Sequence, residues 1–229
     1  KSVVWCPPAG QTGFSALGDV LAGDTNPSGK TSDTFLKDLT QSVSYNNFGK
    51  FEYTNMADKA AKYKGFTGDD VTAIPGFVNY SEGIYVGYKF YETAAAEGLI
   101  DYDKTVVYPF GHGLSYTSFT QTLNSVTESD GTITVDVTVT NTGSVSGKDV
   151  VEVYYNPPYT NGGIEKASAN LIGFAKTSEI AAGASENVQV TFKAEDMASY
   201  DAHGKGCYVL EKGDYIISIN SDSHNVIDS

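Results

Sequence analysis

Residues 108–119 read Tyr-Pro-Phe-Gly-His-Gly-Leu-Ser-Tyr-Thr-Ser-Phe, and they separate two stretches of different character. Pro109 has a fixed φ angle, whereas Gly111 and Gly113 leave the backbone free to turn on both sides of His112. The chain before this segment is loop-rich and mixed, and the chain after it alternates between apolar and polar residues. We therefore predict that this segment, called the seam below, connects two domains.

The chain after the seam is typical of an all-β sandwich. Residues 132–140 alternate with a period of two, so Val135, Val137 and Val139 are expected to face inward. Asp136, Thr138 and Thr140 are then expected to face outward. Turn signals separate about seven predicted strands, as in a two-sheet sandwich. These strands are residues 119–126, 132–140, 150–155, 171–177, 186–192, 207–210 and 215–219.

The chain before the seam is typical of part of an α/β domain. Residues 2–6 are predicted to form a short buried strand, and a Gly-rich turn and a helix follow. Thr12 is the expected cap of that helix and Gly23 its end. Its apolar face is expected to contain Phe14, Leu17, Val20 and Leu21. Residues 31–78 give weak signals, with a short helix predicted between residues 56 and 63, and a further helix is predicted over residues 92–100, ended by Gly98.

Three segments carry a family resemblance. Residues 109–117 resemble the motif that closes the second domain of family 3 glycoside hydrolases, and residues 10–30 and 80–91 are similar to two further blocks of that family. The chain has Thr12-Gly13-Phe14 where the family commonly has Glu-Gly-Gly, and Lys89 where Arg is common. The resemblance implies the C-terminal portion of the family's α/β sandwich domain at residues 1–118. It implies a fibronectin type III-like domain, an immunoglobulin-like sandwich, at residues 119–229.

The resemblance also implies a function. The family hydrolyses β-glycosides with retention, using an Asp nucleophile from a barrel domain and, in its β-glucosidases, a Glu acid/base. The nucleophile has a Ser/Thr-Asp-Trp setting, but the only tryptophan here is Trp5, which follows Val4. The acid/base lies upstream of the strand that residues 3–5 resemble. We therefore expect no catalytic residue, no metal and no cofactor in this chain, and no substrate-binding residue can be assigned.

The expected role is that of a structural brace, a non-catalytic portion of a retaining β-glycosidase that surrounds part of the active site. Its expected partners are the rest of the enzyme, namely the barrel and the remaining sandwich domain, and the β-glucoside or oligosaccharide substrate of that enzyme. The order of barrel and sandwich stays open, and the chain alone is expected not to hydrolyse an aryl β-glucoside. The alternative is an independent carbohydrate-binding or scaffolding module, which would need aromatic side chains along one sheet face. Tyr154 and Tyr155 are instead expected on opposite faces.

Glu82, before the seam, and His112, within it, are two residues that could act as a catalytic acid or a metal ligand. Glu82 lies among aromatic residues that could raise the pKa of a catalytic acid, but a carboxylate that accepts backbone N–H groups near a Gly turn is the favoured interpretation. His112 has no Asp, Glu or Cys within several residues to orient it or to share a metal. A structural histidine that forms hydrogen bonds at the domain junction is therefore expected.

Charge and composition exclude several classes of partner. The formal net charge is −13 and all 15 basic residues are lysines, so neither a duplex nor a phosphate-rich ligand is an expected partner. No apolar run approaches the roughly 18 residues that span a bilayer, so no membrane partner is expected. Cys6 and Cys207 lack metal-site spacing and are expected to be buried free thiols. The sequence does not specify a cellular compartment.

Overall fold

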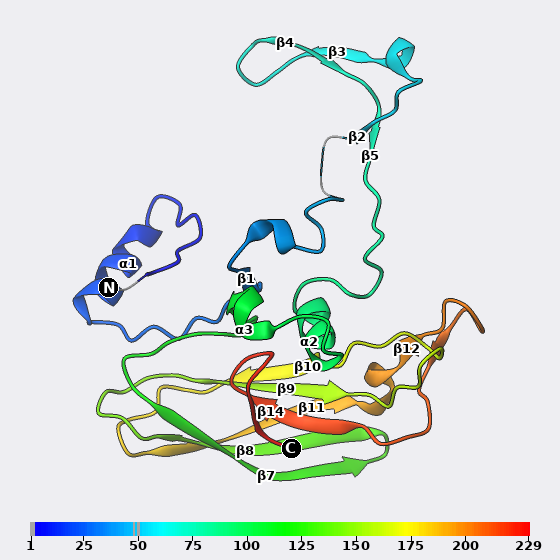
Figure 1. The fold of residues 1–229 in the computed structure, drawn as a ribbon. Coiled ribbons are helices and arrows are strands. Elements are labelled where there is room, and N and C mark those ends of the chain that lie inside the picture. Colours follow the sequence, from blue (N-terminus) through cyan, green and yellow to red (C-terminus); the bar gives the residue numbers. More distant parts are fainter. Residues whose placement is uncertain (1–2, 48, 50) are drawn as a thin grey trace.

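A computed structural model describes residues 3–47, 49 and 51–229. Figure 1 shows a two-sheet β-sandwich formed by the chain after the seam, with short helices over one sheet and a slender β-ribbon that projects away from the sandwich. The α/β fragment followed by an all-β sandwich, predicted from the sequence, is confirmed.

The two sheets of the sandwich are antiparallel. One has the strand order β11-β8-β7 and the other the order β10-β9-β14-β15. The strands of the first sheet are β7 (Phe119–Ser129), β8 (Thr132–Asn141) and β11 (Ser185–Lys193). Those of the second are β9 (Val150–Asn156), β10 (Asn170–Lys176), β14 (Ile216–Asn220) and β15 (Val226–Asp228). Strand β15 was not predicted, because its three residues are too few for a periodic pattern.

The core lies between the sheets and follows the predicted alternation of β8. Val135, Val137 and Val139 are each 0% exposed, and the residues between them are only partly buried. Val153 and Ile219 approach from the opposite sheet. Burying each such side chain stabilises the fold by roughly 1.5–3 kcal/mol.

Strand β9 differs because both of its faces are buried. Tyr155 belongs to the core, whereas Tyr154 points to the outer face, as their adjacent positions predicted. That outer face is covered by Tyr88, whose ring packs edge-on against Tyr154 and stacks on Phe110 of the seam. The sheet therefore has one face for its own core and one for the chain before the seam.

The chain before the seam forms small elements. They are α1 (Gly13–Ala22), β1 (Phe35–Leu36), the 3-10 turn η1 (Leu39–Gln41), α2 (Tyr88–Ala96), α3 (Tyr102–Thr105) and β6 (Val106–Tyr108). The α1 helix ends at Gly23 as predicted, with φ 85°, and Thr12 is its cap but makes no side-chain capping bond. The α2 helix begins at Tyr88, earlier than predicted, and Gly98 follows its end with φ 70°.

The strand predicted at residues 2–6 is not formed. Residues 3–6 are exposed and belong to no helix or strand, and Ser2 lies outside the described residues. A strand needs a neighbour for its backbone hydrogen bonds, and no described strand pairs with these residues, although the Trp5 ring contacts Phe35 of β1. No residue of α1 is buried either: Phe14 and Leu21 are exposed, and Leu17 and Val20 are partly buried.

A ribbon of two antiparallel pairs projects from the body between residues 51 and 77 (Figure 1). Its elements are β2 (Phe51–Glu52), η2 (Ala57–Lys59), β3 (Ala61–Lys64), β4 (Asp70–Ala73) and β5 (Gly76–Phe77). The helix predicted between residues 56 and 63 is wrong, because only one 3-10 turn forms before β3 pairs with β4. Phe51 stacks on Phe77 with ring centroids 5.6 Å apart, which holds the base of the ribbon.

A hairpin at the edge of the sandwich completes the fold. The strand predicted at residues 207–210 is the short β13 (Tyr208–Val209), which pairs with β12 (Ser199–Tyr200) and joins neither large sheet. The 3-10 turn η3 (Ala194–Met197) precedes this hairpin. Among the described residues no helix is long and apolar enough to cross a membrane.

Candidate functional site

The turn at residues 26–31 and the seam are interlocked. The Asn26 side chain accepts hydrogen bonds from Ser115 Oγ (2.9 Å) and from the Tyr116 backbone N–H (2.8 Å), and it donates to the Ser146 carbonyl (3.0 Å). One amide therefore joins the turn, the seam and a sandwich loop. An Asn-Pro-Ser-Gly turn suits this role because its short amide donates and accepts at once.

Backbone bonds continue this contact from Thr31. Its N–H donates to the His112 carbonyl, its carbonyl accepts from the Gly111 N–H, and both distances are 2.8 Å. Its hydroxyl donates to the Pro109 carbonyl at 2.6 Å and accepts from the His112 N–H at 2.9 Å. The two segments thus satisfy one another's buried polar groups.

Glycine is required where the two segments touch. A Cβ atom on Gly113 would lie 2.3 Å from the Gly29 carbonyl oxygen, and one on Gly147 would lie 2.5 Å from the Asn26 side-chain nitrogen. Gly111 has φ 83°, and a Cβ there would lie 2.3 Å from a carboxyl oxygen of Glu152. A larger residue at Gly113 would push the two backbones apart, whereas at Gly111 or Gly147 the side chain of Glu152 or Asn26 would have to move.

Glu152 is a buried carboxyl under the seam. It lies on the outer face of β9, is 4% exposed, and accepts a hydrogen bond from the Tyr154 hydroxyl at 2.8 Å. Burial raises the pKa of Glu152 to about 7, and the Tyr154 bond and the charge of Lys30 only partly oppose this shift. Burial beside this carboxyl also raises the pKa of Tyr154.

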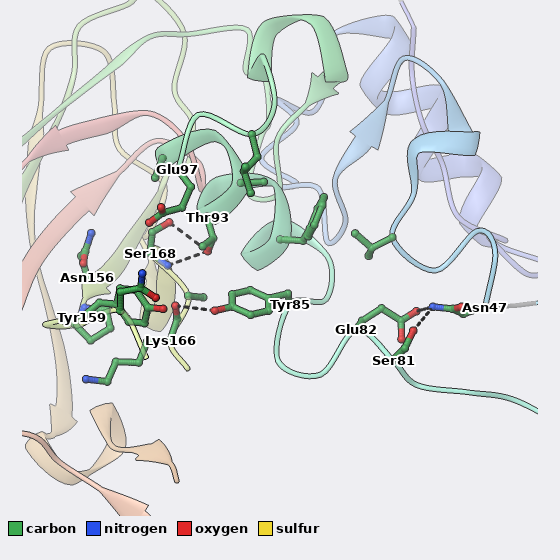
Figure 2. A pocket seen from close by; sticks show the side chains of 18 residues that line it. Asn47, Ser81, Glu82, Tyr85, Thr93, Glu97, Asn156, Tyr159, Lys166 and Ser168 are labelled. Atoms are coloured by element: carbon green, nitrogen blue, oxygen red, sulfur yellow. Dashed lines mark hydrogen bonds between the residues drawn. The ribbon is translucent and has the colours of Figure 1, made fainter. Parts of the chain in front are cut away.

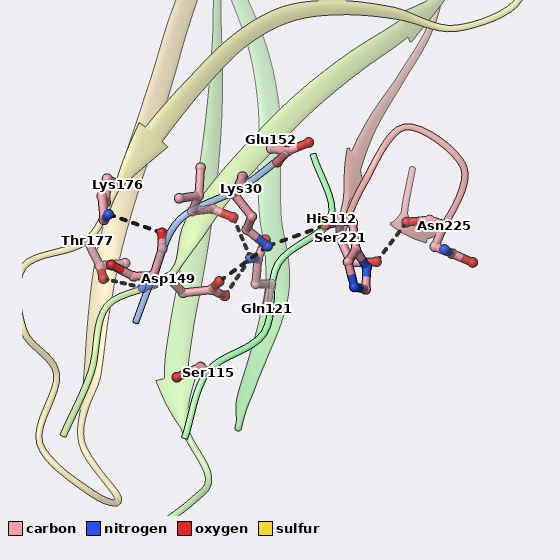
Figure 3. A network of polar contacts seen from close by, with 12 residues as sticks. Lys30, His112, Ser115, Gln121, Asp149, Glu152, Lys176, Thr177, Ser221 and Asn225 are labelled. Atoms are coloured by element: carbon pink, nitrogen blue, oxygen red, sulfur yellow. Dashed lines mark hydrogen bonds and ion pairs between the residues drawn. The ribbon is translucent and has the colours of Figure 1, made fainter. Parts of the chain in front are cut away.

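A network of polar contacts lies at the junction beside Glu152 (Figure 3). Lys30 donates to the Ser221 carbonyl at 3.4 Å and lies 4.0 Å from Asp149. Gln121 donates to Asp149 at 2.9 Å, and Lys176 donates to the Ser28 carbonyl at 3.1 Å. These contacts tie residues 28–30 to three strands or loops of the sandwich.

A second buried carboxyl, Glu92, fastens α2 to the loop before β15. It accepts hydrogen bonds from the Tyr102 hydroxyl (2.7 Å) and from Ser223 Oγ (2.8 Å), and it lies 2.8 Å from His224 Nδ1. The rings of Tyr102 and His224 stack with centroids 3.6 Å apart. Burial is the main cause that raises the pKa of Tyr102, with the charge of Glu92 second. The serine donates to a carboxylate and not to a histidine, so the cluster lacks the geometry of an activated nucleophile.

A groove of about 970 Å³ lies between the two halves. We call it the junction groove; its walls come from residues 81–85, from α2 and from residues 156–168. Figure 2 shows Tyr159 and Ser168 toward one end, Asn47, Ser81 and Glu82 toward the other, and Tyr85 between them. Across the halves, Tyr85 donates to Glu165 at 2.5 Å and the Ser168 N–H donates to Thr93 Oγ1 at 3.0 Å.

The residues singled out from the sequence have structural contacts. Glu82 accepts a hydrogen bond from the Asn47 side chain at 3.1 Å, and no backbone N–H of the described residues donates to its carboxylate. His112 lies at the junction as predicted; its backbone makes the bonds, while its ring stacks on Tyr108 with centroids 5.2 Å apart. Cys6 and Cys207 are free, but the prediction that they are buried is wrong, because nothing described covers either of them.

The sequence did not single out Glu92, Glu152 or His224. A usable signal existed for Glu152, which is a lone carboxylate in the apolar run Val-Val-Glu-Val-Tyr-Tyr at residues 150–155. No such signal marks His224, whose partner is 132 residues away. The described part of the chain contains no group of three or more His, Cys, Asp and Glu residues that could hold a metal ion.

Comparisons with known proteins agree with both halves. Residues 1–88 match the family described as "Glycosyl hydrolase family 3 C-terminal domain", and residues 149–223 match "Fibronectin type III-like domain". Beta-glucosidase A of Butyrivibrio fibrisolvens is 36% identical over 94% of this chain, and thermostable beta-glucosidase B of Acetivibrio thermocellus is 32% identical over 99%. The chain spans only 24% and 26% of these two relatives.

Solved structures give the same result. A beta-glucosidase from Paenibacillus barengoltzii superposes with a TM-score of 0.75 at 35% identity, over 93% of this chain and 20% of that one. Beta-glucosidase 3B from Thermotoga neapolitana, solved with glycerol, superposes with a TM-score of 0.74 at 33% identity, over 95% of this chain and 26% of that one.

Proposed function

Because the chain belongs to glycoside hydrolase family 3, we propose that it is a non-catalytic portion of a retaining β-glycosidase, with residues 1–118 in the α/β sandwich domain and residues 119–229 as the fibronectin type III-like domain. The complete enzyme would hydrolyse terminal β-D-glucosides or related β-glycosides. This chain would brace that enzyme and form part of the surroundings of its active site.

The interlocked turn and seam carry this proposal. Asn26 and Thr31 bind the seam through side chain and backbone, and Gly113 allows its backbone to contact the Gly29 carbonyl. Such a contact fixes the sandwich relative to the chain before the seam. A brace needs this rigidity, since the loops that reach an active site are only as well placed as their support.

The exposed apolar residues near the start of the chain support a partner. Trp5, Phe14 and Leu21 are between 62% and 67% exposed, on α1 and the segment before it. An α/β layer is stable when such faces are covered by further strands or helices. We propose that the remaining portion of the same enzyme covers them and supplies the nucleophile and the acid/base.

Hydrolysis assays on the purified chain test the catalytic part of this proposal. The chain alone should release no aglycone from an aryl β-glucoside, because a retaining mechanism needs two carboxyl groups about 5 Å apart on either side of the bond. Glu82→Gln is the matched variant and should be indistinguishable from the parent chain. Turnover that persists through repurification and disappears in Glu82→Gln would contradict the proposal and identify Glu82 as a catalytic acid.

A further inference from the structure

The junction groove has walls that are already held in place. Lys166 is buried in the loop between β9 and β10, where its ammonium group donates to the Pro158 carbonyl and pairs with Glu211. Tyr85 and Thr93 make the bonds to this loop described above. A site whose walls are bonded before a ligand arrives loses less conformational entropy on binding.

Several polar groups in the groove have no partner among the described residues. The side chains of Asn156, Asn161, Glu97 and Tyr159 line the groove and make no hydrogen bond there. Aromatic rings accompany them, since Tyr85, Phe90 and Tyr159 all contribute to the walls. Rings that can stack on the C–H face of a pyranose, beside amides and carboxylates that can bond its hydroxyls, suit a sugar.

The charge of the groove restricts the ligand further. Lys166 is the only Lys or Arg that lines it in the described part of the chain, and its ammonium group is already paired with Glu211. Two carboxylates, Glu82 and Glu97, line the walls instead. An anionic ligand such as a phosphate ester would meet these charges without a free cation to bind it.

We propose that the junction groove binds a neutral oligosaccharide, which stacks on Tyr159 and donates and accepts hydrogen bonds at Asn156 and Glu97. The choice of an oligosaccharide as the ligand rests on the proposed function, because a glycosidase acts in the presence of such carbohydrate chains. The groove spans both halves, so an occupied groove would also stabilise the junction by mass action.

Calorimetric titration of the whole chain tests this proposal, with cellotetraose as the probe. We expect saturable binding with a Kd of about 1 mM or tighter. Tyr159→Ala should weaken binding about fivefold, while Tyr159→Phe, which keeps the ring, should remain within about twofold. Tyr159 is 46% exposed and makes no hydrogen bond among the described residues, so its truncation should leave the melting temperature unchanged. Tyr208→Ala, at a 73% exposed tyrosine outside the groove, is the control and should bind as the parent does.

Three results would overturn the proposal. They are the absence of saturable binding, equal weakening by Tyr159→Ala and Tyr208→Ala, and binding that Tyr159→Ala leaves unchanged. Cellobiouronate, in which a carboxylate replaces one C6 hydroxymethyl group of cellobiose and both pyranose rings remain, should bind more weakly than cellobiose, and equal binding would refute the charge argument. These titrations need no hydrolysis and no second polypeptide, so their failure is distinguishable from failure of the proposed function.

Discussion

The most informative substitution is Glu152→Gln, which removes the ionisation of the carboxyl buried under the seam. Burial raises the pKa of Glu152 to about 7 from its ordinary value near 4.5. The folded chain therefore holds this proton more tightly than the unfolded chain does. As the pH rises from about 4.5 to about 7 the unfolded state loses its proton first, and the free energy of unfolding falls.

The size of this effect follows from the shift. One pKa unit corresponds to about 1.36 kcal/mol, so raising the pKa of Glu152 from 4.5 to about 7 removes about 3 kcal/mol of stability between pH 4.5 and pH 8. Repulsion from Asp149 and Asp222 adds to the cost of the charge, while Lys30 reduces it. Glutamine has the same shape, stays neutral and can still accept the bond from the Tyr154 hydroxyl. The NH2 group of the glutamine needs a hydrogen-bond acceptor near Gly111, so the measured gain in the free energy of unfolding is expected to be below about 3 kcal/mol.

Urea unfolding followed by circular dichroism from pH 5 to pH 8 measures this effect. We expect the stability of Glu152→Gln relative to the parent chain to increase by about 1–3 kcal/mol between pH 5 and pH 8. Glu195→Gln changes an exposed carboxyl of η3 and is the matched control. If the parent and Glu152→Gln curves stay parallel across this range, the carboxyl does not ionise in a buried site and the reasoning fails.

Three further substitutions, two of them with a control, test the packing. Gly113→Ala should lower the free energy of unfolding by at least about 2 kcal/mol in thermal unfolding, because its Cβ would lie 2.3 Å from the Gly29 carbonyl. The control Gly18→Ala in α1, whose Cβ would meet no atom within 4 Å, should be neutral or slightly stabilising, and equal effects of the two would contradict the close contact. Asn26→Ala should lower the free energy of unfolding by about 1–3 kcal/mol through its three lost bonds, and a loss confined to a few tenths would show that water replaces them. Val137→Ala should cost about 1–3 kcal/mol in urea, and Thr138→Ala below 1 kcal/mol although Asn124 donates to its hydroxyl; similar costs would be incompatible with one buried and one outer position.

The sandwich was predictable because its signal is local. Strict alternation placed Val135, Val137 and Val139 inside, and each strand assignment needed only its own residues and the turns beside it. The missing strand at residues 3–6 shows the limit of such a signal. An apolar run predicts a strand, but only a neighbouring strand can satisfy its backbone.

The polar contacts of the junction were not predictable for a different reason. Glu92 meets His224 and Asn26 meets Tyr116 across 132 and 90 residues, so no spacing pattern links them. The motif residues could be recognised as a connector from Pro109 and the glycines around His112. The sequence does not show why these positions are glycine. The structure shows it, because Glu152 lies against Gly111 and the Gly29 carbonyl lies against Gly113.

The proposed function requires this chain to be one portion of a larger β-glycosidase. Size-exclusion chromatography of an extract of the source, with an antibody raised against residues 119–229 and an aryl β-glucoside assay on every fraction, tests this requirement. The chain has a mass of 24.4 kDa and spans 24% of a β-glucosidase relative, so antibody signal and activity should elute together at roughly 100 kDa or above. Antibody signal confined to a monomer near 24.4 kDa, with hydrolysis in other fractions, would contradict the account.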